Sequence, residues 1–252
     1  MTEKSWEPVR TGAQSSKLPR IHADMHRFFS RLIREDPCIS AARRDLSVNQ
    51  GRTHSLRRGD RSIMLRELVL KNRSYRRFHQ EIPVSLETLR ELVDLARVSA
   101  SGANLQPLKY ILSCDPTINA LIFANLAWAG YIKDWPGPEE GERPAAYIII
   151  LGDKTISQAF GCDHGIAAQS ILLGATEMGL GGCMIGSIRR AELSQALAIP
   201  AEYEILLVIA LGKPKERVVL EAVGPGGDIR YWRDEHAVHH VPKRSLSEII
   251  VG

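Results

Sequence analysis

Hydrophobic residues recur along most of the chain at one of two spacings. Recurrence every three to four residues predicts a helix, and recurrence every second residue predicts a strand. The clearest helical pattern follows Ser85, where Leu86, Leu89, Val93 and Ala96 fall on one face. Serine is a favoured N-cap because its hydroxyl accepts a hydrogen bond from a backbone N–H of the first turn. The pattern therefore predicts an amphipathic helix that begins next to Ser85 and buries one face.

The other patterns predict an alternation of strands and helices. Runs rich in Ile, Val and Tyr predict strands at residues 110–113, 145–151 and 204–211. Helical spacing predicts helices at residues 64–71 and 118–131. We therefore expect an α+β protein.

Residues 165–178 are apolar or small on nearly every side of a helix. A helix of this kind must be buried, and its small residues allow another helix to approach closely. The pattern leaves open whether this helix lies in the core of one protomer or in an interface between subunits.

The composition is that of an ordinary globular protein, with 44% hydrophobic and 25% charged residues among 252. The longest apolar runs, residues 147–151 and 205–211, have the length of a strand and not of a membrane span. The N-terminus lacks the apolar core of a secretory signal, and the four cysteines show no CxxC spacing, which disfavours a zinc or dithiol site. We expect a cytoplasmic protein with reduced thiols.

Residues 1–63 differ in charge from the rest of the chain. They carry 13 Lys and Arg against 7 Asp and Glu, whereas residues 64–252 carry 20 against 22. This slight excess of acidic residues in the larger part argues against nucleic-acid binding, which favours a basic face. Apolar residues recur at helical spacing within the basic part, with arginines largely between them: Ile21, Met25, Phe28, Phe29, Leu32 and Ile33. Such a helix could contact a membrane or a partner, but the simpler interpretation is a basic N-terminal extension outside the main domain at residues 64–252.

Two short motifs carry the most distinctive chemistry. Residues 72–78, NRSYRRF, place Arg73, Arg76 and Arg77 around Ser74, and guanidinium groups are suited to gripping a phosphate through paired hydrogen bonds. Residues 101–107, SGANLQP, offer neutral donors and acceptors that suit the edge of a heterocyclic ring. Taken alone, an arginine cluster is more often a solvated face, and SGANLQP could be an ordinary loop.

These motifs resemble those of the FMN-dependent nitroreductase family, and two further segments extend the resemblance. Residues 163–186, DHGIAAQSILLGATEMGLGGCMIG, resemble the family's central helix and the glycine-rich loop that follows it. Residues 241–249, VPKRSLSEI, resemble the segment whose basic pair returns to the flavin phosphate. The resemblance covers residues 64–251 and implies a three-layer α/β/α fold with a central, mostly antiparallel sheet that dimerises through helices.

The resemblance also implies cofactor-binding residues at the matching positions. The phosphate would contact Arg73, Ser74, Arg76, Lys243 and Arg244, and the flavin ring would approach Ser101, Asn104, Gln106, Met184, Ile185 and Gly186. No catalytic side chain is implied, because the flavin itself carries the hydride chemistry.

The implied activity is an NAD(P)H oxidoreductase with FMN bound in residues 64–252. NADH or NADPH would pass a hydride to the flavin, and a nitroaromatic or quinone acceptor would then take its place in a ping-pong cycle. The implied assembly is a homodimer with FMN at the interface. The proline-rich loop at residues 135–144 is expected to act as a lid that selects the acceptor.

Several alternatives stay open. The same scaffold could serve a flavin reductase, a dehalogenase or a flavin-destroying enzyme, and a flavin-binding or partner-binding protein without turnover is a further possibility. A plain α+β domain with surface arginines would bind no flavin. No Walker A motif or GxGxxG fingerprint is present, and a metal site among His236, His239 and His240 is disfavoured because no matching Cys or His lies elsewhere.

Overall fold

The structure is a computed structural model that describes residues 64–132 and 134–252. The basic amphipathic helix expected near residues 21–33 lies outside the described residues, and the division of the chain at residue 63 stays a prediction. No helix among the described residues is long and apolar enough to cross a membrane.

Five strands of the described part form the main sheet: β1 (Phe78–His79), β2 (Leu108–Ser113), β3 (Ala146–Asp153), β4 (Gly181–Ile185) and β5 (Tyr203–Pro214). Strand β5 is central, with β3 on one side and β4 on the other, while β1 pairs with its last residues and β2 extends the sheet beyond β3. Every pair is antiparallel. The sheet that the resemblance implied is confirmed.

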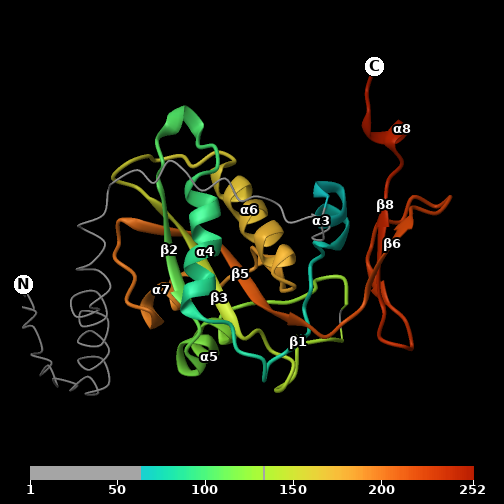
Figure 1. Ribbon diagram of the computed structural model, residues 1–252, viewed down its shortest axis with the longest axis horizontal. Helices are drawn as coiled ribbons and strands as arrows, with labels where there is room; N and C mark the ends of the chain where they lie inside the picture. Colours follow the sequence, from blue (N-terminus) through green and yellow to red (C-terminus); the bar gives the residue numbers. More distant parts are fainter. Residues whose placement is uncertain (1–63, 133) are drawn as a thin grey trace, which may run out of the picture. The chain divides into compact units, whose positions relative to one another are not determined.

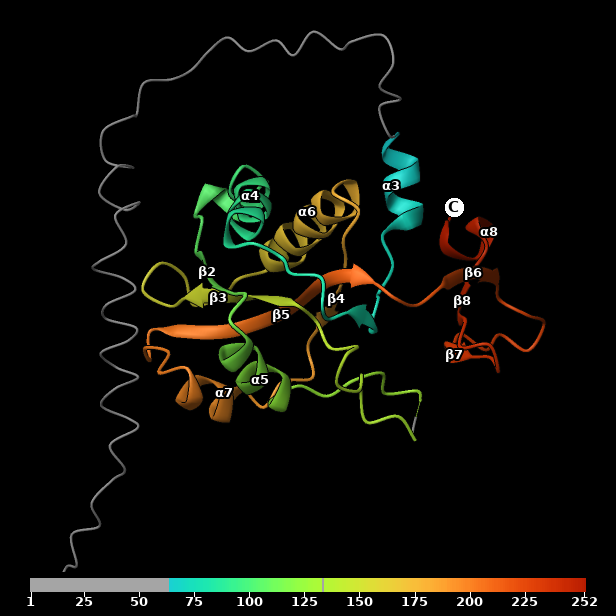
Figure 2. The ribbon, with the colours of Figure 1, turned by 60° about the horizontal axis from the view of Figure 1, so that its bottom comes forward.

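Helices cover both faces of this sheet, as Figures 1 and 2 show. Helices α4 (Leu86–Arg97) and α6 (Asp163–Glu177) lie on one face, and α5 (Pro116–Ala124) and α7 (Arg190–Ala196) lie on the other. The remaining helical segments are short: α3 (Leu65–Lys71), the 3₁₀ turn η1 (Gly102–Asn104) and α8 (Leu246–Ile249). The three-layer α/β/α fold is therefore confirmed.

Helix α4 forms as its sequence predicts. The Ser85 hydroxyl accepts the Thr88 backbone N–H at 3.0 Å, and Leu89, Leu92 and Ala96 are buried on the inner face. Each such apolar side chain stabilises the fold by about 1.5–3 kcal/mol when fully buried, and less for alanine.

Helix α6 buries one face in the core of the protomer, as its sequence allowed, and its role in an interface between subunits stays a prediction. Ala168, Ile171 and Ala175 are fully shielded in the core cluster shared with α4 and the sheet. A Cβ on Gly174 would clash with the Leu95 side chain, so glycine here lets the two helices approach closely.

Alternation along β3 divides the core into two clusters. Ile148 and Ile150 pack toward α4 and α6, whereas Tyr147 and Ile149 pack toward α5 and α7. All eight residues of β3 are buried, because helices cover both faces of the strand.

The helix predicted at residues 118–131 has other bounds. It begins at Pro116, because Asp115 caps its first turn, and it ends at Ala124. Beyond Asn125 the backbone of Ala127 donates to Ser187 at 2.9 Å, so the chain leaves the helix to pair with the segment after β4. This tertiary pairing outweighs the apolar pattern that extended the prediction.

A second sheet of the described residues consists of β6 (Val218–Ala222), β7 (Trp232–Arg233) and β8 (His239–Lys243). Strand β8 lies between the other two, parallel to β6 and antiparallel to β7. Two of the histidines considered as metal ligands, His239 and His240, are thus held in strand β8.

Candidate functional site

The arginine motif lies between α3 and β1 and is fixed to strand β4 by the backbone. Ser74 forms a parallel bridge with Gly182, and the Tyr75 N–H donates to the Gly182 carbonyl at 3.0 Å. A Cβ on Gly182 would lie 2.6 Å from the Ala210 carbonyl oxygen, so only glycine lets β4 sit between the motif and β5. The motif is therefore part of the main sheet's framework and not a solvated helix face.

A cavity of about 360 Å³ opens beside this motif. Its lining includes three cations, Arg73, Arg76 and Lys243, together with Ser74 and Met184, and no Asp or Glu. Arg73 donates to the Val69 carbonyl at 2.6 Å, while its Nε is buried without a partner and burial lowers its pKa. Concentrated positive charge and an unused buried donor together favour an anion in this cavity.

Arg76 is held by contacts on both its backbone and its side chain. Its backbone N–H donates to the Glu216 carboxylate, and its Nη1 lies 3.2 Å from the Ser74 carbonyl oxygen. The guanidinium carbon lies 4.8 Å from the centre of the Tyr231 ring, a cation–π distance. The orientation of Arg76 is thus set by the protein itself.

His239 contacts the same guanidinium from strand β8. It is 1% exposed, and burial, assisted by the charge of Arg76, lowers its pKa to about 4. The ring is therefore neutral near pH 7 and can accept a hydrogen bond at Nε2, which lies 3.3 Å from Arg76 Nη1. The proton then resides on Nδ1, which is buried without a partner.

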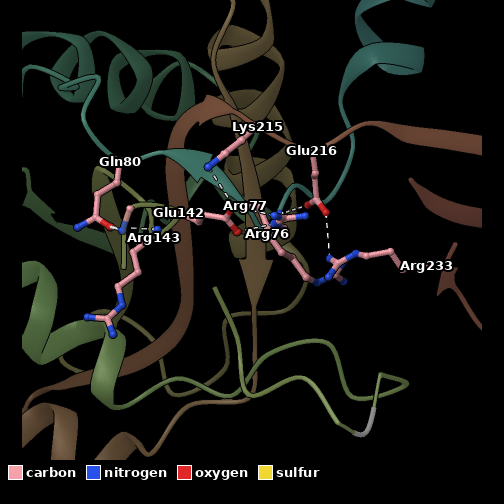
Figure 3. A network of polar contacts seen from close by, with 9 residues as sticks. Arg76, Arg77, Gln80, Glu142, Arg143, Lys215, Glu216 and Arg233 are labelled. Atoms are coloured by element: carbon pink, nitrogen blue, oxygen red, sulfur yellow. Dashed lines mark hydrogen bonds and ion pairs between the residues drawn. The ribbon is translucent and has the colours of Figure 1, made fainter. Parts of the chain in front are cut away.

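Two carboxylates form ion pairs and hydrogen bonds around the arginine motif, as Figure 3 shows. Glu216 is fully shielded and lies 3.1 Å from Arg233, and Glu142 pairs with Arg77 and with Lys215. Hydrogen bonding to Arg77 is the main cause that lowers the pKa of Glu142 to about 2. The loop expected to act as a lid is therefore anchored at Glu142 to the arginine motif, and its role in acceptor choice stays a prediction.

A second, smaller cavity of about 150 Å³ adjoins the first and shares Arg76, Met184 and Tyr231 with it. Ile185 and Gly186 also line this cavity, which runs along the end of β4. The two cavities together bring seven of the predicted cofactor residues to one place: Arg73, Ser74, Arg76, Met184, Ile185, Gly186 and Lys243.

The chain enters β4 through a defined helix end. Gly179 has φ +73°, its N–H donates to Thr176, and the Leu180 N–H donates to Ala175, which is the Schellman pattern. Strand alternation after this turn exposes Met184 and buries its neighbour Cys183. Burial raises the pKa of Cys183, which agrees with its interpretation as a small core residue.

The SGANLQP loop lines a different cavity, of about 150 Å³, that shares no lining residue with the arginine cavity. Asp163 organises the loop by accepting from the Ser101 hydroxyl at 2.6 Å and from the Gly102 N–H at 2.9 Å. Asn104 accepts a hydrogen bond from the Gln106 amide at 3.2 Å. The predicted ring-binding residues Ser101, Asn104 and Gln106 are therefore separate from the phosphate-binding residues within one protomer.

The two predicted C-terminal basic residues have different environments. Lys243 ends β8 and lines the arginine cavity, whereas Arg244 is half-exposed and lies 3.6 Å from Glu248 of α8. The structure therefore brings Lys243, and not Arg244, into the cavity.

Comparison with known proteins matches this arrangement to one family. The model described as the Nitroreductase family matches residues 69–213, which is more than half of the chain. The chain belongs to the nitroreductase family. A curated relative, the NADPH-flavin oxidoreductase of Vibrio harveyi, is 25% identical over 167 residues, which cover 60% of this chain and 65% of the relative. The chain thus spans slightly less than two thirds of that relative.

Solved structures of nitroreductase family proteins share the fold. One from Clostridium difficile 630 has a TM-score of 0.53 and 20% identity, covering 75% of this chain and 98% of that one. One from Streptococcus pneumoniae TIGR4 has a TM-score of 0.53 and 16% identity, covering 65% and 96% respectively. At these identities the likeness shows the nitroreductase fold alone.

The family match ends at residue 213, before much of the cavity lining. Glu216, Tyr231 and His239 lie beyond it, and sequence reasoning did not assign them to the site. Glu216 meets Arg76 across 140 residues of sequence, and no local pattern signals such a contact. His239 was considered only as a metal ligand, because its burial beside Arg76 depends on the second sheet.

Proposed function

We propose that residues 64–252 bind FMN and act as an NAD(P)H oxidoreductase. The observation that carries this proposal is the cavity lined by Arg73, Arg76 and Lys243 without a carboxylate, which shares Met184 with the smaller cavity beside it. The cations of the larger cavity suit a phosphate, and the ring would extend from there toward Met184, which lines both cavities. Family membership supports the same interpretation, and the relative from Vibrio harveyi is named an NADPH-flavin oxidoreductase.

The residues of the chain would perform separate tasks. Arg73 and Lys243 would neutralise phosphate charge, and the unpartnered Nε of Arg73 supplies one further donor. Arg76, oriented by Ser74 and His239, would place positive charge where the ring gains electrons. When bound, the flavin would accept a hydride from NADH or NADPH and pass it to a nitroaromatic or quinone acceptor in a ping-pong cycle.

We propose further that two copies of the chain form a dimer with FMN at the interface. Support comes from Ser101 and Gln106, which line a cavity apart from the arginines of their own protomer, and a second copy would bring both sets to one ligand. Large apolar side chains are also exposed on α3 and near the C-terminus: Met64, Leu65, Leu246, Ile249 and Ile250. Sedimentation velocity tests this directly, and a monomer at micromolar concentration would contradict it. Localisation in the cytoplasm stays a prediction.

FMN binding is tested by titrating the apoprotein with FMN and measuring the Kd, with Arg73→Ala as the informative variant. Loss of hydrogen bonds to a charged group costs about 1.5–3 kcal/mol, which corresponds to a rise in Kd of about tenfold to a hundredfold. Arg66→Ala, which removes an exposed arginine of α3, is the matched control and should keep the affinity of the parent protein. Unchanged affinity in Arg73→Ala would contradict the phosphate assignment.

Turnover needs a separate measurement, because FMN binding alone does not establish it. Anaerobic addition of NADH or NADPH to the FMN-loaded protein should bleach the flavin absorbance. A loaded protein whose absorbance persists with both donors would instead be a flavin-binding protein without this activity.

A further inference from the structure

A further cavity lies on the face of the sheet covered by α5, outside the region assigned to FMN. It has a volume of about 190 Å³ and lies between α5 and the segments at residues 80–84 and 143–145. It shares no lining residue with either part of the arginine cavity. Its lining is mixed: Val84, Phe123 and Pro144 are apolar, whereas Gln80, Glu81, Asn119 and Arg143 are polar or charged.

Tyr147 supplies a buried and unused hydroxyl at this cavity. The side chain belongs to β3, lines the cavity and is 1% exposed, and its hydroxyl has no hydrogen-bond partner. Buried hydroxyl groups are nearly always paired, so an unpaired one calls for a partner from outside the chain. Burial raises the pKa of Tyr147, with Arg143 acting in the opposite direction, so the hydroxyl stays protonated and can donate.

Arg143 places an uncompensated positive charge at the same cavity. Its guanidinium carbon lies 4.5 Å from the centre of the Phe123 ring, and its Nε is buried without a partner. Among the described residues no carboxylate lies within ion-pair distance of it. The neighbouring Glu142 forms its ion pair with Arg77, and Figure 3 shows the Arg143 side chain directed away from that pair.

We propose that this cavity binds a small organic carboxylate. A carboxylate accepts hydrogen bonds only, so it matches the two donors, Arg143 and the Tyr147 hydroxyl. An apolar cavity of about 150 Å³ holds benzene in another protein, so 190 Å³ is enough for a body of one ring against Phe123. The one carboxylate at the rim, Glu81, is 68% exposed and pairs with His79, so solvent and His79 screen its repulsion.

Benzoate is the probe, and the uncharged benzamide, which has the same shape, is its control. Cys114 lines the cavity and is exposed, so its rate of alkylation by iodoacetamide, followed by peptide mass spectrometry, reports occupancy at this place. Cys162, also exposed but outside the lining, is the internal reference. Benzoate should slow alkylation of Cys114 in a saturable manner and leave Cys162 unchanged, and benzamide should protect neither.

Two variants assign the donors. Tyr147→Phe and Arg143→Gln should each weaken the protection by benzoate at least tenfold. Tyr147→Phe should also melt at or above the temperature of the parent protein, because it removes a buried hydroxyl that has no partner. In Glu81→Gln, benzoate should protect Cys114 from alkylation as well as it does in the parent protein, or better.

The proposal is overturned if saturating benzoate leaves the alkylation of Cys114 unchanged, or if benzamide protects equally. It is also overturned if Tyr147→Phe melts lower yet binds benzoate normally, since the hydroxyl would then serve the fold. FMN affinity, measured in the same samples, should be unchanged in both variants. Failure here is therefore distinguishable from failure of the proposed oxidoreductase function.

Discussion

The buried pair of Glu216 and Arg233 offers a direct test of what holds the arginine motif in place. The Glu216 side chain is fully shielded from solvent, Arg233 is 14% exposed, and their charged atoms lie 3.1 Å apart. Glu216 also accepts the backbone N–H of Arg76. The substitution Glu216→Gln keeps the shape of the side chain, removes its charge and leaves the buried guanidinium without a carboxylate.

The expected cost follows from these contacts. Breaking a buried ion pair from one side costs about 3–5 kcal/mol, because an uncompensated charge stays buried. The Trp135 ring, whose centre is 4.6 Å from the Arg233 guanidinium carbon, retains part of the stabilisation of that charge. We therefore expect Glu216→Gln to lower the free energy of unfolding by about 3 kcal/mol, or about a hundredfold in the folding constant.

Urea unfolding, at one fixed protomer concentration, measures this difference between the variant and the parent protein. Asp228→Asn is the control, because it breaks an ion pair with Arg230 in which both side chains are more than half exposed. Exposed pairs contribute about 0–1 kcal/mol. If Glu216→Gln costs no more than this control, the reasoning from burial is refuted.

Two further predictions concern pH. Arg77 is the main cause that lowers the pKa of Glu142 from 4.5 to about 2, so this pair stabilises the fold above pH 4.5 and the stabilisation is lost as pH falls through about 2. Glu142→Gln should remove that part of the decline in melting temperature, and an unchanged decline would contradict the assignment. The pKa of His240 is raised above 6.5 by hydrogen bonds to Asp234 and then to Glu221, so its contribution is complete below pH 6.5 and is lost as pH rises through the raised value. His240→Asn should flatten the melting-temperature profile above pH 6.5, and a profile identical to that of the parent protein would show that this ring does not control it.

Features with local causes were predictable from the sequence. Helix α4 follows from the Ser85 cap and the spacing of its apolar residues, both of which act within a few positions. The clustering of Arg73 and Arg76 at one cavity follows from their closeness in the chain. The resemblance then supplied Met184 and Lys243, which no local pattern would connect to these arginines.

Features that depend on tertiary contacts were not predictable in this way. The end of α5 at Ala124 is set by pairing of the following residues with the segment after β4, so the apolar pattern to residue 131 misled the prediction. Glu142 reaches Arg77 across 65 residues and appears in the sequence only as one acid in a charged loop. The unpaired hydroxyl of Tyr147 is likewise invisible, because a buried tyrosine in a strand predicts only packing.

The candidate site has two parts that can change separately, of which the bridge between Ser74 and Gly182 fixes the first. Ser74 and Met184 belong to one hydrogen-bonded framework, in which a shift of β4 by a single residue would reverse the directions of Cys183 and Met184. Tyr231 and Lys243 reach the cavity from the segment that carries the second sheet, where residues 223–231 connect β6 to β7. Insertions in that connection would reshape one wall of the cavity while leaving the framework intact. Relatives that handle ligands of different size are therefore expected to differ in length there, and to conserve the length between α6 and β4.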